Sequence, residues 1–215
     1  MLGQRAEIFA MQNRYEKCVA ELRRQIEVTP NDFYPRVYIV HARAATNDWN
    51  ELETARASLR SDFAGVADPL VTLWLALLGP PQANLNWNEK LELVDGYREK
   101  MPDDADVALL QGAILVRNKD FERAEQVLAL VLDKASSPRI IASTQLWLSE
   151  AKLQLAKTDE AQRLRNSAEA WIAQWCSLDI AAENILNSPT SDNEPLNWLQ
   201  RVELHDWLAH TGPSR

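Results

Sequence analysis

The chain has 215 residues, 46% of them hydrophobic and 25% charged, with a formal net charge of −8 at pH 7. That composition is ordinary for a globular protein and sufficient for a sizeable core. The acidic balance argues against a nucleic-acid partner, because phosphate binding requires a basic face, and against docking on an anionic membrane.

The longest nearly uncharged apolar stretch runs from Pro69 to Gly79, whereas a membrane-spanning helix needs about 20 apolar residues. The start of the chain lacks the basic segment and apolar run of a signal peptide. The two cysteines, Cys18 and Cys176, lie too far apart in the sequence for a metal or redox motif. We therefore expect a reducing, cytoplasmic setting, with both thiols packed as small apolar groups.

A short polar break followed by a large residue recurs along the chain, and the flanking apolar residues follow a helical period. The residues directly after the breaks are Tyr15, Trp49, Trp87, Phe121 and, in the aromatic place, Thr158. They recur at intervals of roughly 34 to 38 residues, which fits a repeat made of two helices. Because glycine is scarce and long alternating β-branched runs are absent, the pattern predicts an all-α fold.

Small residues in these repeats predict close contact between the two helices of each pair. Ala124 and Ala161 lie one turn after the break residue, as Cys18 does in the first repeat. Gly112 has the matching role in the first helix of the fourth repeat. We expect these side chains to let the helices approach, while a residue such as Phe121 fills the space beside the turn.

The aromatic spacing, the small sites and the helix-ending prolines Pro30 and Pro102 resemble the tetratricopeptide repeat (TPR) family over roughly residues 3–175. The resemblance implies a right-handed α–α superhelix, or solenoid, of about five helix pairs plus two C-terminal capping helices. The expected array covers 1–175, with repeats at about 1–32, 33–64, 66–103, 104–137 and 138–175, and the capping helices lie in 176–215.

Repeats two and three depart from the family pattern. Leu52 and Lys90 stand where a small residue is usual, and we expect a longer turn from Gly79 to Asn86. The last repeat and the tail also resemble large bacterial multidomain proteins, in which such arrays follow a kinase domain or WD-repeats. No kinase motif occurs in this chain, so this resemblance suggests a context and not an activity. Because a helical pattern begins at about Leu2 without an evident polar capping helix, we hypothesise that the chain is an excised C-terminal segment of a larger signalling protein.

The tail after Trp175 is expected to form a short helix at Leu178 to Asn187, a loop, and an amphipathic helix at Pro195 to His210. Trp198 and Trp207 lie in this last helix. Two interpretations are open: the tryptophans line an aromatic ligand pocket, or the helix seals the open end of the array. The seal is favoured, since repeat arrays must cap their ends.

No catalytic or metal motif is present in the sequence. His205 and His210 do not share a helix face, and no HExxH, nucleophile elbow or phosphate-binding loop occurs. Asp103 and Asp104 lie in a turn, where a helix cap is a better interpretation than acid–base chemistry. We expect no enzyme activity, no cofactor and no metal.

In TPR proteins the first helices line a concave face that binds extended or helical peptides. The resemblance maps this face onto Tyr34, Val37, His41, Asp106, Leu109, Ala113, Val116, Arg117, Ser143, Leu146, Glu150, Leu153 and Gln154. Among these only Arg117 is basic, whereas Asp106 and Glu150 are acidic, so a mixed or mildly basic partner segment is expected. Packing against neighbouring helices is the alternative role for each of these side chains.

The sequence thus predicts a non-catalytic protein-interaction scaffold that binds a peptide or partner protein. A regulatory sensor domain that binds a small ligand in the concave face is the alternative, and an enzyme comes third.

Overall fold

The computed structural model describes residues 2–65, 68–81, 85–175 and 198–211, and within these ranges it contains eleven helices and no strand. The all-α prediction is therefore confirmed for the described residues. The chain forms two compact units. Unit 1 comprises Met1–Gly79 and Cys176–Asp206, and unit 2 comprises Pro80–Trp175 and Trp207–Arg215.

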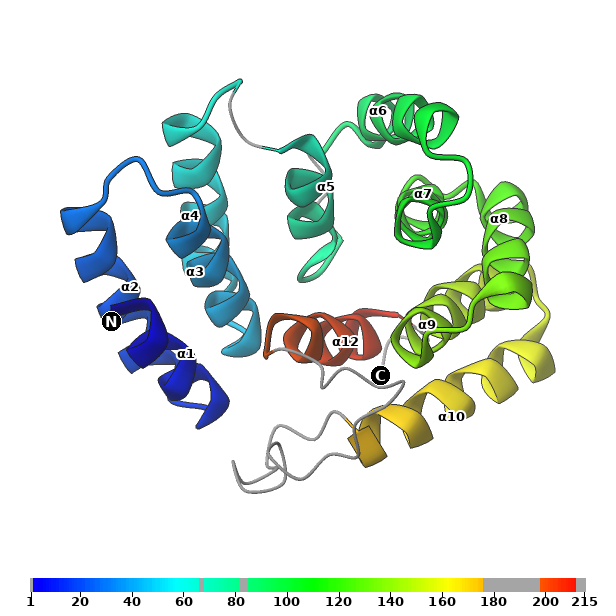
Figure 1. Ribbon diagram of the computed structural model, residues 1–215. Coiled ribbons are helices and arrows are strands. Elements are labelled where there is room, and N and C mark those ends of the chain that lie inside the picture. The colour runs from blue at the N-terminus through cyan, green and yellow to red at the C-terminus, as the bar shows by residue number, and fades with distance from the viewer. Residues whose placement is uncertain (1, 66–67, 82–84, 176–197, 212–215) are drawn as a thin grey trace. The chain divides into compact units, whose positions relative to one another are not determined.

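Unit 1 begins with two pairs of helices whose members pack side by side (Figure 1). Its helices are α1 (Leu2–Met11), α2 (Tyr15–Val28), α3 (Tyr34–Ala45), α4 (Trp49–Asp62) and α5 (Pro69–Leu77), and the part of α12 (Trp198–His210) up to Asp206 belongs with them.

Unit 2 contains two further side-by-side pairs, α7 with α8 and α9 with α10 (Figure 1). Its helices are α6 (Trp87–Lys100), α7 (Ala105–Arg117), α8 (Phe121–Lys134), α9 (Pro138–Gln154) and α10 (Thr158–Trp175), together with the end of α12 from Trp207. Each predicted repeat range holds two of these helices. The boundary between the units falls after Gly79, inside the predicted third repeat.

The break residues have the same structural place in every pair. Tyr15, Trp49, Trp87, Phe121 and Thr158 are the first residues of α2, α4, α6, α8 and α10. Aspartate and asparagine cap several helices just before their first residues, as the breaks predict: Asp48 accepts a hydrogen bond from the Glu51 N–H, and Asp104 accepts one from the Val107 N–H.

The same tight turn joins α1 to α2, α3 to α4, α7 to α8 and α9 to α10. Its central residue has a positive φ at Asn13 (56°), Asn47 (54°), Lys119 (64°) and Ala156 (60°). In the third of these turns, the Lys119 N–H donates to the Val116 carbonyl and the Asp120 N–H donates to the Leu115 carbonyl. This is the Schellman pattern, which satisfies the last carbonyls of the first helix and reverses the chain in three residues.

Small residues bring the helices of a pair together at the predicted sites. Cys18 and Ala124 are fully buried and Ala161 nearly so. At Gly112, an added Cβ would lie only 2.3 Å from Cδ2 of Leu128 on the facing helix. Burial raises the pKa of the Cys18 thiol to about 12, so it stays protonated and packs as a small apolar group.

The second repeat replaces its small site by a different arrangement. Leu52, on α4, is buried, and the glycine that follows α5 makes room for it. A Cβ on Gly79 would lie 3.1 Å from Leu52 Cδ2 and 3.3 Å from the ring of Trp49. The longer connection expected here runs from Leu78 to Asn86, and residues 82–84 of it lie outside the described residues.

The C-terminal tail differs from the amphipathic helix expected at Pro195 to His210. The described helix is Trp198–His210, and within it Ala209 is the one residue classed as exposed. Its polar residues Arg201 and Asp206 are buried along with Trp207. The amphipathic prediction was wrong because polar as well as apolar side chains of this helix are buried, and the Asp206 carboxylate, for example, binds the Gly79 N–H. The predicted helix at Leu178–Asn187 and the loop after it lie outside the described residues.

No helix in the described part of the chain is long and apolar enough to cross a membrane.

Candidate interaction surface

The residues predicted to face a partner lie on α3, α7 and α9, and their exposure differs widely. The exposed ones are Tyr34, Asp106 and Gln154; Arg117, Glu150 and Leu153 are partly exposed; and Val37, His41, Leu109, Ala113, Val116, Ser143 and Leu146 are buried. The buried members pack against neighbouring helices. While those helices stay packed, the exposed and partly exposed members are the ones that can touch a partner.

The charged members of this set already have contacts inside unit 2. Asp106 forms an ion pair with Arg139. The Arg117 guanidinium lies over the ring of Trp147, 5.1 Å from its centroid. Glu150 accepts a hydrogen bond from Gln154 at 2.9 Å. The first two of these contacts join α7 to α9, and the third lies within α9.

In unit 1, the side of α3 that carries His41 is covered by the chain's own α12. The Trp198 ring meets Tyr38 and His41 edge to face, with centroid distances of 5.8 and 6.2 Å. Trp198 and Val202 belong to the same buried cluster as Val37. A helix is thus seated on this side of α3 through aromatic and aliphatic side chains.

The imidazole of His41 joins the two helices by hydrogen bonds. Its Nδ1 lies 3.0 Å from the Val37 carbonyl oxygen, and its Nε2 lies 3.1 Å from Oε1 of Glu203 on α12. The carbonyl can only accept, so Nδ1 carries a proton. The contact with Glu203 then requires one more proton, held either by Nε2 of an imidazolium or by the carboxyl group.

A third polar contact fixes the register of α12. The carboxylate of Asp206, itself buried, accepts a hydrogen bond of 2.8 Å from the backbone N–H of Gly79. Gly79 follows the end of α5 and has a φ of 74°. We call Tyr38, His41 and the Gly79 N–H together the docking face of unit 1.

In unit 2, the end of α12 packs against the last helix pair. Trp207 is fully buried, and its ring centroid lies 5.9 Å from that of Trp147 on α9. Arg165 on α10 donates to the carbonyl oxygens of Leu208 and Thr211. The expected sealing role fits this stretch of the helix, whereas Trp198 to Asp206 lie against helices from the start of the chain.

Two arginines hold helix ends in the same way, one in each unit. Arg56 is the eighth residue of α4 and donates to the carbonyls of Leu75 and Leu78 at the end of α5. Arg165 is the eighth residue of α10. It donates to the carbonyls of Leu208 and Thr211, which lie two residues before the last residue of α12 and one residue after it. A cation at a helix C-terminus satisfies carbonyls that lack a partner and opposes the helix dipole.

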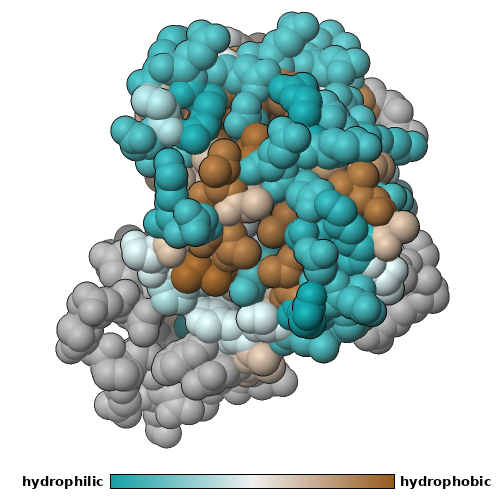
Figure 2. Space-filling model, turned by 90° about the vertical axis from the view of Figure 1, so that its right-hand side faces the viewer, coloured by the Kyte–Doolittle hydropathy of each residue, from teal (hydrophilic) through white to brown (hydrophobic). Residues whose placement is uncertain are grey.

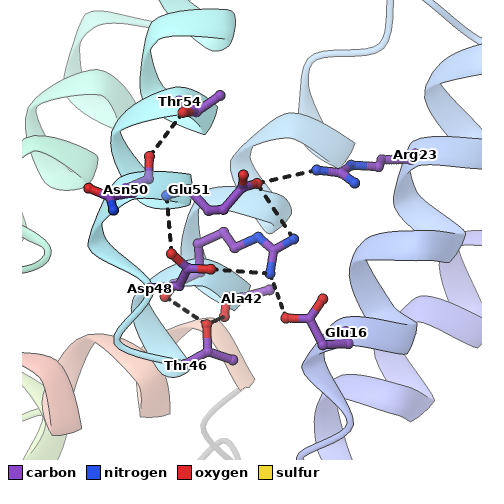
Figure 3. Close-up of polar contacts among 9 residues, drawn as sticks. Glu16, Arg23, Ala42, Thr46, Asp48, Asn50, Glu51 and Thr54 are labelled. Carbon is purple, nitrogen blue, oxygen red and sulfur yellow. Dashed lines mark hydrogen bonds and ion pairs between the residues drawn. The ribbon is translucent and has the colours of Figure 1, made fainter.

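A buried arginine organises the polar contacts of the first two helix pairs (Figure 3). Arg43 on α3 forms ion pairs with Glu16 of α2 at 2.6 Å and with Glu51 of α4 at 3.7 Å. In unit 2, Lys152 on α9 has the matching position before its turn and binds Glu125 and Glu160, both at 2.7 Å. These ion pairs tie each first helix to the second helices on either side, so they are structural.

A small hollow opens in unit 2 where α6 ends, α7 begins and α8 passes. It has a volume of about 140 Å³, and its lining includes Arg98, Lys134 and Leu130, which is 61% exposed. Figure 2 shows hydrophobic side chains reaching the surface among hydrophilic ones on one face of the molecule. Small-molecule sites usually measure about 300–1,000 Å³, so this hollow suits one side chain better than a metabolite.

No family model, curated protein or solved structure matches the chain. The TPR resemblance therefore stays a prediction from the residues. Across the ranges that the structure describes, no group of three or more His, Cys, Asp or Glu side chains could hold a metal ion.

Sequence reasoning missed the residues that build the docking face. Glu203 is 162 positions away from its partner His41, and Asp206 is 127 positions away from Gly79. No local pattern pairs residues at such separations. The sequence therefore carried no signal that pairs these residues.

Proposed function

We propose that this chain is a non-catalytic helical scaffold that binds a helical segment of a partner protein, in a cytoplasmic setting. The observation that carries the proposal is the helix seated on the docking face of unit 1. Trp198 packs on Tyr38 and His41, and Glu203 bonds to His41. A face that receives one helix through specific side-chain contacts has the shape and chemistry to receive another.

The kind of contact supports binding by side chains. Helix-in-groove recognition uses a few anchors spaced along one side of a helix. Here an aromatic anchor, an aliphatic residue and an acidic residue follow each other at Trp198, Val202 and Glu203. Tyr34, at the start of α3, is 64% exposed and offers aromatic surface to a partner.

A sensor that binds a small ligand is the alternative. Its best support is the hollow beside Leu130, whose volume of about 140 Å³ is below the usual range for small molecules. The scaffold proposal therefore takes precedence. A metabolite that raises the melting temperature in a ligand screen would favour the sensor, because binding to the folded state stabilises it.

Position-specific crosslinking tests the scaffold. A photoreactive phenylalanine analogue replaces Tyr34 in the full chain and, as a matched control, Leu130 on α8, which has a similar exposure. We expect a protein that crosslinks from position 34 and not from position 130. The purified candidate should then bind the wild-type chain in calorimetry. Equal crosslinking from both positions, or no binding by the purified candidate, would contradict the proposal.

A further inference from the structure

We propose that residues Trp198 to Asp206 occupy the docking face as a built-in competitor, and that the partner is an acidic amphipathic helix that displaces them. This inference rests on the proposed function and names its partner class. The chain's own helix shows the chemistry that the face accepts, since α12 (Trp198–His210) contacts the ring of Tyr38, the imidazole of His41 and the N–H of Gly79.

The contacts all come from one side of the helix. With about 100° of rotation per residue, Trp198, Val202, Glu203 and Asp206 fall within a sector of roughly 140°. Leu199, which packs against the same cluster, falls in that sector too. A partner helix can therefore reproduce the whole set with one face.

The aromatic position comes first in this pattern. Trp198 is nearly buried, and its ring meets two rings of α3, those of Tyr38 and His41, edge to face. Paired rings in this geometry stabilise a contact beyond the burial of their area. A partner helix therefore needs a large aromatic side chain at this position.

Two acidic positions follow, five and eight residues after the aromatic one. Glu203 meets the Nε2 of His41, and Asp206 meets the N–H of Gly79. The Gly79 N–H can only donate, so a partner needs an acceptor opposite it, as Asp206 provides. His41 Nε2 shares a proton with the side chain that it meets, so glutamic acid or glutamine fits there. A basic side chain at the position of Asp206 would leave the Gly79 N–H facing a cation without an acceptor. This acidic requirement differs from the mildly basic partner that the sequence predicted.

The test uses the full-length chain and a labelled peptide with the sequence from Pro195 to Thr211. In the protein, Trp198→Ala with Glu203→Ala weakens the built-in helix. Fluorescence anisotropy then measures peptide binding. We expect saturable binding to this opened chain and at least about tenfold weaker binding to wild type, because an attached helix competes at millimolar effective concentration.

Peptide variants distinguish recognition by these side chains from non-specific binding. Trp198→Ala or Asp206→Lys in the peptide should lower affinity at least about tenfold, the loss expected when an interface anchor is removed. Glu203→Gln should retain binding, because its amide N–H can donate to the Nε2 of a neutral imidazole. Ala209→Lys is the matched control: residue 209 is exposed in the structure, so this peptide should bind like the parent.

Each outcome decides between the alternatives. No saturable binding to the opened chain, or equal binding of the Trp198→Ala peptide, overturns the inference. Should the opened chain fail to show helical circular dichroism, the single Glu203→Ala chain replaces it with the same expected order of peptides. Dimers that exchange α12 between copies would make a second copy the occupant and also overturn the inference. If the peptide fails while crosslinking from position 34 succeeds, the scaffold binds its partner elsewhere and only this inference falls.

Discussion

The pair α7–α8 and the helix α12 are held in opposite ways. The pair closes on small side chains: Gly112 lies against Leu128, and Ala124 is fully buried one turn into α8. The partners are close in the sequence and the turn between them is regular. By contrast, α12 is held by large aromatic rings and by polar groups from distant parts of the chain, such as Glu203 with His41.

This difference separates what is built by local sequence from what is built by tertiary contact. In a pair of helices joined by a three-residue turn, the contacting residues are close in the sequence. The stability of such a pair depends on how closely its side chains pack. A helix that returns from far along the chain must be positioned by specific contacts, since each polar group that it buries needs a partner. The pair α7–α8 should therefore be sensitive to added side-chain volume, and α12 should be sensitive to the loss of a contacting side chain.

The largest effect should come from breaking the aromatic contact of α12 in unit 2. Trp207→Ala removes a fully buried ring that packs on Trp147, so we expect a loss of about 3–5 kcal/mol in the free energy of unfolding. Urea denaturation followed by circular dichroism measures it. Leu130→Ala is the matched control, because Leu130 is exposed and its loss should cost far less. Equal losses in both variants would show that Trp207 is not an anchor.

A somewhat smaller effect should come from adding one methyl group to the regular pair. In Gly112→Ala, the new Cβ would lie 2.3 Å from Leu128 Cδ2, so the Leu128 side chain or the helices themselves must shift. We expect a net loss of about 1–3 kcal/mol, because overpacking outweighs the better helix propensity of alanine. Chemical denaturation again provides the measurement.

Gly96 in α6 is the matched control for this substitution. No atom lies within 4 Å of a Cβ built there, so Gly96→Ala should stabilise the protein by about 0.5–1 kcal/mol. Shortening the facing side chain tests the cause: Gly112→Ala should cost less in a Leu128→Ala background than in wild type. A stabilising Gly112→Ala would contradict the close approach of the two helices.

The helix pairs could be predicted because their signals are local. Phe121 begins α8 as expected, and the polar break before it forms the turn at Lys119. Asp104 caps the helix that starts at Ala105, as the turn composition indicates. Helix propensity, helix capping and hydrophobic periodicity each depend on residues a few positions apart, so a single sequence is enough to detect them.

The docking face could not be predicted because its partners are not neighbours. His41 was assigned to a partner-binding face, and the structure places it beneath α12, buried against Trp198 and Glu203. Helical periodicity shows that His41 and Val37 share a side of α3, but it does not show what covers that side. The register of α12 depends on contacts such as Asp206 with Gly79, which only the folded chain brings together.

The ion pairs of Glu125 connect the pair α7–α8 to the pair α9–α10. Removing this charge should change the free energy of unfolding by a smaller amount, and the change should depend on pH. Hydrogen bonds from Lys152 and Lys157 hold the pKa of Glu125 below its ordinary value of 4.5. A carboxyl group with a lowered pKa stabilises the folded state above its ordinary pKa, and this contribution is lost as the pH falls through the lowered value. Glu125→Gln should therefore cost about 1 kcal/mol at pH 7, and this difference should disappear in acid.

Urea denaturation of both proteins at several pH values checks this expectation. The difference between wild type and Glu125→Gln should be full at neutral pH and shrink only below about pH 4.5, the ordinary value. The exposed Glu122, one turn earlier on α8, is the matched control, and Glu122→Gln should have little effect at any pH. A difference for Glu125→Gln that is independent of pH would remove the charge as its cause.

The smallest expected effect concerns the turns themselves. Ala156 has a φ of 60°, a left-handed conformation that costs an alanine roughly 1–2 kcal/mol and costs glycine nothing. The greater freedom of glycine in the unfolded chain offsets part of this gain, so Ala156→Gly should stabilise the protein by about 0.5–1 kcal/mol. Asn47→Gly is the matched control: asparagine already tolerates this conformation, so the gain should be near zero. Thermal unfolding of the two variants gives the comparison. An equal gain at both sites would mean that the turn residues differ only in unfolded-state freedom, and that the left-handed residue of the Schellman turn carries no strain.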